Sequence, residues 1–88
     1  GAERVQQLKQ GEQQSAKLGQ THLFIEPPYR NQAMFQSLIE TLKPSTRLCI
    51  ARALTSEQEW VQTRRIAEWK KQAPPDLDKQ PTLFLFLA

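Results

Sequence analysis

The chain has 88 residues, of which 39% are hydrophobic and 24% are charged. This is ordinary for one small soluble domain or for a piece of a larger protein. No apolar run is long enough to span a membrane and no signal-peptide core is present, so we expect a cytoplasmic protein. A single cysteine, Cys49, and a single histidine, His22, exclude an internal disulfide and a metal site built on these residue types. Cys49 stands in an apolar run, which favours a buried and inert thiol.

The net charge is +3, and four of the cations fall close together, at Arg64, Arg65, Lys70 and Lys71. Two interpretations stay open for this cluster. It is either a solvated surface or a patch that faces phosphate groups, in which case salt would weaken binding steeply.

Residues 3–17 are polar and rich in glutamine, with Val5 and Leu8 on one face. The pattern predicts a solvent-facing helix that packs lightly on a sheet. Gly11 is expected to weaken this helix by about 1 kcal/mol relative to alanine. Gly19 has the position of a helix-terminating glycine.

Residues 21–26 predict a strand whose side chains alternate between two faces, with Leu23 and Ile25 on one face and His22, Phe24 and Glu26 on the other. Pro27 and Pro28 cannot donate to a sheet, so the strand ends there. A turn at the carboxyl end of a strand is where open α/β sheets tend to bind ligands. The residues alone do not identify the ligand.

Residues 31–42 predict a helix with one apolar stripe, made of Met34, Phe35, Leu38, Ile39 and Leu42. Asn31 is expected to cap its N-terminus, and Pro44 stops it.

Residues 48–54 and 82–87 are apolar at nearly every position. Both stretches are therefore expected to be internal strands that are buried on both faces. Arg52 interrupts the first stretch and needs a partner, because a buried unpaired guanidinium costs several kcal/mol. Glu26 ends a neighbouring strand, so we predict that Glu26 pairs with Arg52 or with Arg30.

The stretch 55–72 is ambiguous from local signals. Ser56 and Glu59 have the spacing of a capping box, which favours a helix starting here. Residues 60–64 are rich in strand-forming types, whereas 66–71 suggest a short helix. Taken in order, the elements predict an α/β fold in which a mixed sheet is covered by helices.

Three segments together resemble one family, namely LFIEPPYRN, LCIARALTSEQEWVQTRRIAEWKK and PTLFLFL. The chain resembles the C-terminal lobe of the tetrapyrrole methylase family of S-adenosylmethionine-dependent methyltransferases, nearest to the branch that methylates ribosomal RNA at ribose 2′-hydroxyls. Residues 26–30 match the Glu–Thr/Ser–Pro–Tyr/His–Arg turn of that family, and 51–55 match its Ala-Arg-Glu-Leu-Thr motif. Pro27 and Ala53 depart from the family pattern, and each removes a polar side chain.

The resemblance implies that residues 59–64 form a strand and 66–72 a helix. It also implies that 1–88 are the second lobe of a two-lobed enzyme, with 1–19 as an N-terminal helix. The glycine-rich first lobe is not in this sequence, and the cofactor, S-adenosylmethionine, would lie in the cleft between the lobes. By resemblance, the residues that contact the cofactor are Pro28, Tyr29, Ala51, Leu54 and Thr63. No catalytic residue is expected in this lobe.

Several functions remain open. The parent protein would methylate small-subunit ribosomal RNA, with the isolated lobe inactive, or would methylate a tetrapyrrole of the precorrin type. A small basic module is an alternative, docking ribosomal RNA through Arg64, Arg65, Lys70 and Lys71. A dimerising lobe is a third, because members of this family commonly form homodimers and a lobe without its partner exposes an apolar patch.

Overall fold

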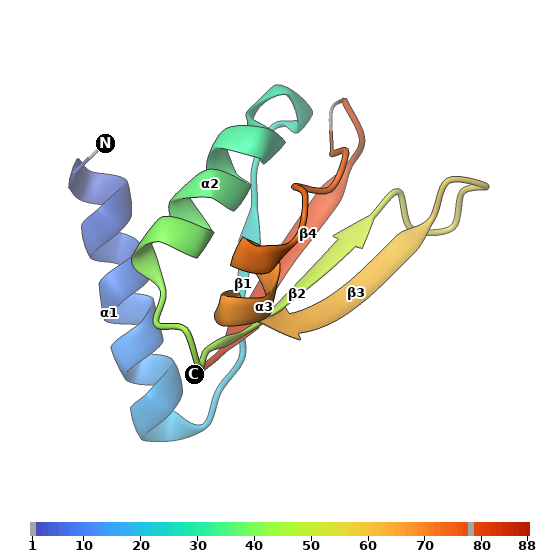
Figure 1. Ribbon diagram of the computed structural model, residues 1–88. Coiled ribbons are helices and arrows are strands. Elements are labelled where there is room, and N and C mark those ends of the chain that lie inside the picture. Colours follow the sequence, from blue (N-terminus) through green and yellow to red (C-terminus); the bar gives the residue numbers. More distant parts are fainter. Residues whose placement is uncertain (1, 78) are drawn as a thin grey trace.

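The computed structural model describes residues 2–77 and 79–88. The elements in chain order are α1 (Ala2–Leu18), β1 (His22–Ile25), the 3-10 turn η1 (Pro28–Arg30), α2 (Asn31–Thr41), β2 (Arg47–Arg52), β3 (Trp60–Arg65), α3 (Ile66–Lys71) and β4 (Thr82–Leu87). Figure 1 shows the three α-helices on one side of a twisted sheet.

The sheet has four strands in the order β1-β4-β2-β3, and each neighbouring pair is antiparallel. The predicted α/β class is confirmed, and so is the internal position of β2 and β4. The predicted mixed sheet is wrong. β1 and β2 do run in the same direction, but β4 lies between them and is antiparallel to both.

The core lies between the sheet and the helices. Alternate residues of the two central strands face the helices and are fully buried, namely Leu48, Ile50, Phe84 and Phe86. From the helices, Phe35 meets Trp69 edge to face with ring centroids 5.8 Å apart. The buried Trp69 indole donates a hydrogen bond to the Leu48 carbonyl oxygen at 3.0 Å, so this large side chain is both packed and satisfied.

Within the described part of the chain, no helix covers the other side of the sheet, so the predicted burial of both strands on two faces is wrong. We call this side the open face. Register places its side chains in two rows, Ile25–Leu83–Ala51–Val61 and Leu23–Leu85–Cys49–Thr63. The outer strands are the most exposed, with Ile25 67%, Leu23 54% and Val61 53% accessible. Cys49 is half-buried on this face rather than inside the core.

The N-terminal helix is confirmed, but it packs closely rather than lightly. Leu8 is fully buried, and Gly11 sits where a β-carbon would lie 3.2 Å from the Phe86 ring. Gly11 therefore permits close approach of α1 to the sheet. Glu12 is 6% exposed and its carboxylate accepts hydrogen bonds from the Lys43 backbone N–H and the Thr46 hydroxyl.

The second helix is confirmed with its apolar stripe inward, but the predicted capping role of Asn31 is wrong. The N-cap residue is Arg30, and Asn31 is the first helical residue. Its buried amide nitrogen lies within hydrogen-bond distance of the Leu77 and Gln80 carbonyl oxygens and of the Thr82 hydroxyl. Asn31 thus ties the start of α2 to the segment that leads into β4.

The ambiguous stretch folds as the resemblance implies, into a strand followed by a short helix. The helix suggested by Ser56 and Glu59 is wrong. The Glu59 carboxylate does reach back, but it accepts from the Thr55 backbone N–H at 2.8 Å and closes a turn between β2 and β3. The same side chains that can cap a helix can close a turn, because both leave backbone N–H groups to be satisfied.

Among the helices of residues 2–77 and 79–88, none has the length and apolar character needed to cross a membrane.

Candidate functional site

The two turns that resemble family motifs meet at one end of the sheet, where β1 and β2 terminate. Because β1 and β2 run in the same direction, the turn after Ile25 and the turn after Arg52 emerge side by side. Between them lies an open pocket of about 350 Å³, lined by Ile25, Glu26, Pro28, Leu54, Pro81, Thr82 and Leu83. We call this the edge pocket. Its wall is mostly apolar, as binding sites for small organic groups usually are.

The second turn is held in an unusual backbone conformation. Ala53 and Thr55 have φ angles of 51° and 65°, in the left-handed region that non-glycine residues rarely adopt. The Ala53 N–H donates to the Pro81 carbonyl oxygen at 2.7 Å, which ties this turn to the start of β4. Strained residues of this kind cluster at functional sites.

The residues expected to contact the cofactor are only partly brought together. Pro28 and Leu54 line the edge pocket. Ala51 does not line the pocket; it lies opposite Leu83 in register on the open face, where it is buried. Tyr29 is outside the described lining and is 74% exposed, and Thr63 is exposed one row farther along the open face.

The pocket also has a wall that the sequence analysis missed, formed by Pro81, Thr82 and Leu83. No local pattern in the sequence indicated this wall, because it depends on the insertion of β4 antiparallel between β1 and β2. That insertion makes β4 begin at the end of the sheet where β1 and β2 terminate.

The predicted pairing of Glu26 with Arg52 or Arg30 is wrong, because Glu26 forms an ion pair with Arg4 of α1. Glu26 follows an edge strand beside α1, whereas β4 separates it from β2. Arg52 instead donates to the Asp76 carbonyl oxygen at 2.6 Å, and its guanidinium lies 5.4 Å from the centre of the Trp60 ring.

A second hollow flanks the turn after β1, on the side of that turn that faces α1 and α2. It measures about 300 Å³ and is lined by Arg4, Arg30, Ala33, Met34 and Ser37. We call it the arginine hollow. The Arg30 guanidinium lies 5.6 Å from the centre of the Tyr29 ring, which it partly covers.

The predicted basic cluster lies away from the edge pocket. Arg64 and Arg65 lie at the C-terminal end of β3, which is the opposite end of the sheet because Arg65 faces Arg47 at the start of β2. Strands of six residues separate the two ends of the sheet by roughly 17 Å. Lys70 and Lys71 are exposed in the last turn of α3.

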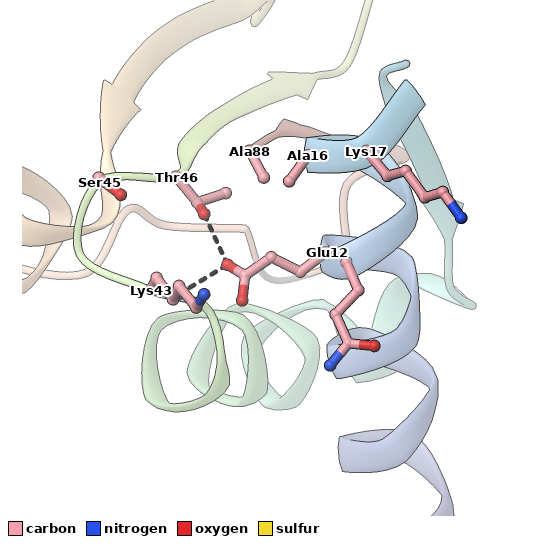
Figure 2. Close-up of a pocket in the computed structure, with 8 residues that line it drawn as sticks. Glu12, Ala16, Lys17, Lys43, Ser45, Thr46 and Ala88 are labelled. Carbon is pink, nitrogen blue, oxygen red and sulfur yellow. Dashed lines mark hydrogen bonds between the residues drawn. The ribbon is translucent and has the colours of Figure 1, made fainter. Parts of the chain in front are cut away.

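The hollow in Figure 2 lies at the same end of the sheet as Arg64 and Arg65, between α1 and the segment before β2. It measures about 490 Å³, and Lys17 and Lys43 flank its one buried carboxylate, Glu12. Glu12 already accepts two hydrogen bonds from the chain, at 2.7 Å from the Lys43 N–H and 2.5 Å from the Thr46 hydroxyl. Its role is therefore to hold α1 to the sheet.

Across residues 2–77 and 79–88, no group of three or more His, Cys, Asp or Glu side chains could hold a metal ion. In comparisons with known proteins, no family model matches this chain, and no curated protein matches it significantly.

Proposed function

We propose that this chain is the cofactor-cleft lobe of an S-adenosylmethionine-dependent methyltransferase that modifies a ribose 2′-hydroxyl of small-subunit ribosomal RNA. The observation that carries the proposal is the convergence of the turns at 26–28 and 53–55 on the edge pocket. These are the two segments that resemble the motifs of the family, and they come from strands separated in the sequence by a whole helix.

The edge pocket suits the adenosine half of the cofactor. Its volume of about 350 Å³ lies at the lower end of the usual range for ligand pockets, as expected for half of a cleft. Pro28, Leu54 and Leu83 would exclude water from one side of a planar base. The bound cofactor would supply a methyl group carried on a sulfonium, and the neutral thioether left after transfer is a good leaving group.

The chemistry asked of this lobe is positioning and exclusion of water. Glu26 is the carboxylate that lines the edge pocket, and it is already paired with Arg4. We therefore assign no general base within the described part of the lobe. The isolated lobe is expected to bind cofactor weakly and to be inactive.

The open face supports the need for a second structural layer. Four-stranded sheets with one face packed on helices usually keep polar side chains on the other face, but here Leu23, Ile25 and Leu85 are apolar. In our proposal the glycine-rich first lobe of the same protein completes the cleft next to this face. Without the first lobe, this face should drive self-association of the chain. The homodimer proposed for the complete protein rests on the resemblance to the family.

The cofactor site is tested by ultraviolet crosslinking of methyl-labelled S-adenosylmethionine to the chain, a method that captures weak binding. Labelling should map to 26–28 and 53–55, and Leu54→Arg should abolish it by filling the pocket. Gln14→Arg, at an exposed position of α1, serves as the matched control. Equal labelling of both variants would remove the edge pocket as the cofactor site.

The open face is tested by sedimentation velocity. Leu23→Lys should shift the chain toward monomer, while Gln14→Lys should sediment like the wild type. A wild-type chain that stays monomeric at high concentration would contradict the role of this face.

A further inference from the structure

We propose that the turn carrying Tyr29 and Arg30, together with Arg4 of α1, is a docking site for single-stranded RNA. One base stacks on the Tyr29 ring, and the neighbouring phosphate lies in the arginine hollow. The inference rests on the proposed function, since it places the RNA beside the pocket assigned to the methyl donor.

Tyr29 is presented in a way that no core requirement explains. It is 74% exposed, at the centre of a turn that two preceding prolines hold stiff. The Arg30 N–H closes this turn by donating to the Pro27 carbonyl oxygen at 2.8 Å. A rigid aromatic ring loses little freedom when a base stacks on it, and stacking on aromatic side chains is how single-stranded RNA is commonly bound.

Arg30 partly covers the Tyr29 ring, with its guanidinium 5.6 Å from the ring centre. This leaves the remaining ring surface for a base and places a cation beside it. The guanidinium fork of arginine matches two phosphate oxygens at once, and it contributes a cation–π contact to the stack.

The arginine hollow has the donors that a phosphate needs. Arg4 and Arg30 line it with the Ser37 hydroxyl, and Ala33 and Met34 supply an apolar side. Arg4 pairs with Glu26 and donates to the Met34 sulfur at 2.9 Å. The Glu26 side chain is only 11% exposed, so the charges of Arg4, Arg30 and Glu26 together leave the hollow with a net positive charge.

The two hollows flank the same turn, because Glu26 and Pro28 line the edge pocket while Arg30 lines the arginine hollow. An RNA strand with one base stacked on Tyr29 therefore runs past the edge pocket. The basic residues Arg64 and Arg65 lie at the opposite end of the sheet from the edge pocket, so their contribution to RNA binding can be measured separately.

The test is fluorescence anisotropy of the chain with a short labelled single-stranded RNA and with the same sequence as a duplex. Tyr29→Ala should weaken single-strand binding by about 5- to 150-fold, and Tyr29→Phe should not. Arg30→Gln should reduce the log–log salt slope by about 0.7. The matched control, Arg65→Gln, should leave single-strand affinity unchanged. Thermal unfolding of each variant checks that it folds.

The inference is overturned if Tyr29→Ala binds like the wild type, if Arg65→Gln weakens binding as much as Arg30→Gln, or if the duplex binds more tightly than the single strand. Cofactor crosslinking in the same variants separates it from the proposed function. Intact crosslinking with Tyr29-independent RNA binding removes only the docking site. Absent crosslinking with Tyr29-dependent RNA binding removes only the cofactor assignment and supports the docking site.

Discussion

Arg4, in the first turn of α1, forms an ion pair with Glu26, which directly follows β1. The pair links the N-terminal helix to the turn that separates the edge pocket from the arginine hollow. Its two side chains are partly buried, at 28% and 11% exposure. The helix therefore helps to position the candidate site as well as to cover the sheet.

Breaking this pair should lower the stability of the domain. Arg4→Met and Glu26→Gln should each reduce the free energy of unfolding by about 1 kcal/mol, since partial exposure screens the interaction. The double variant should show a coupling of about 0.5 to 1 kcal/mol in urea denaturation. Strictly additive single effects would mean that the pair contributes nothing.

The buried carboxylate of Glu12 should matter more. In Glu12→Ala the Lys43 N–H and the Thr46 hydroxyl both lose their acceptor, which should cost about 2 to 3 kcal/mol of unfolding free energy. Thr46→Val removes one donor and should cost about 1 kcal/mol. The double variant should be less destabilised than the sum of the two, because one orphaned donor is gone.

Gly11→Ala should destabilise the protein even though alanine favours helices by about 1 kcal/mol over glycine. The new β-carbon would lie 3.2 Å from the Phe86 ring. That ring cannot easily yield, since it is fully buried and stacked with His22 and Phe24. We expect a net loss of about 1 to 2 kcal/mol by thermal unfolding. Gln14→Ala, at an exposed site of the same helix, should be neutral or slightly stabilising.

Thr55→Gly should raise stability, because Thr55 has a φ of 65° that glycine adopts without strain. Relief of about 1 to 2 kcal/mol exceeds the entropic cost of glycine, for a net gain of about 0.5 to 1 kcal/mol. Thr63→Gly, in an extended strand, should be destabilising and serves as the control. A stabilised Thr55→Gly that crosslinks cofactor less well would indicate that the strain serves the site.

The candidate site was predictable from the sequence only in part. Pro28 and Leu54 were expected to contact the cofactor, and they line the edge pocket. Tyr29 lies outside that lining because its side chain projects from a 3-10 turn into solvent. The wall formed by Pro81 to Leu83 could not be placed, because its position depends on where β4 inserts into the sheet.

Local patterns in the sequence determined the identity of most elements. The apolar stripe of α2 and the alternation in β1 are properties of neighbouring residues, so they can be read directly. The segment that became β3 and α3 was too short for its pattern to decide, and only the resemblance separated strand from helix.

The tertiary structure alone decided how the elements are arranged. It placed β4 between β1 and β2, put all the helices on one face, and paired Glu26 with Arg4. These outcomes join residues far apart in the chain. They depend on the summed burial of many side chains, which no local periodicity records.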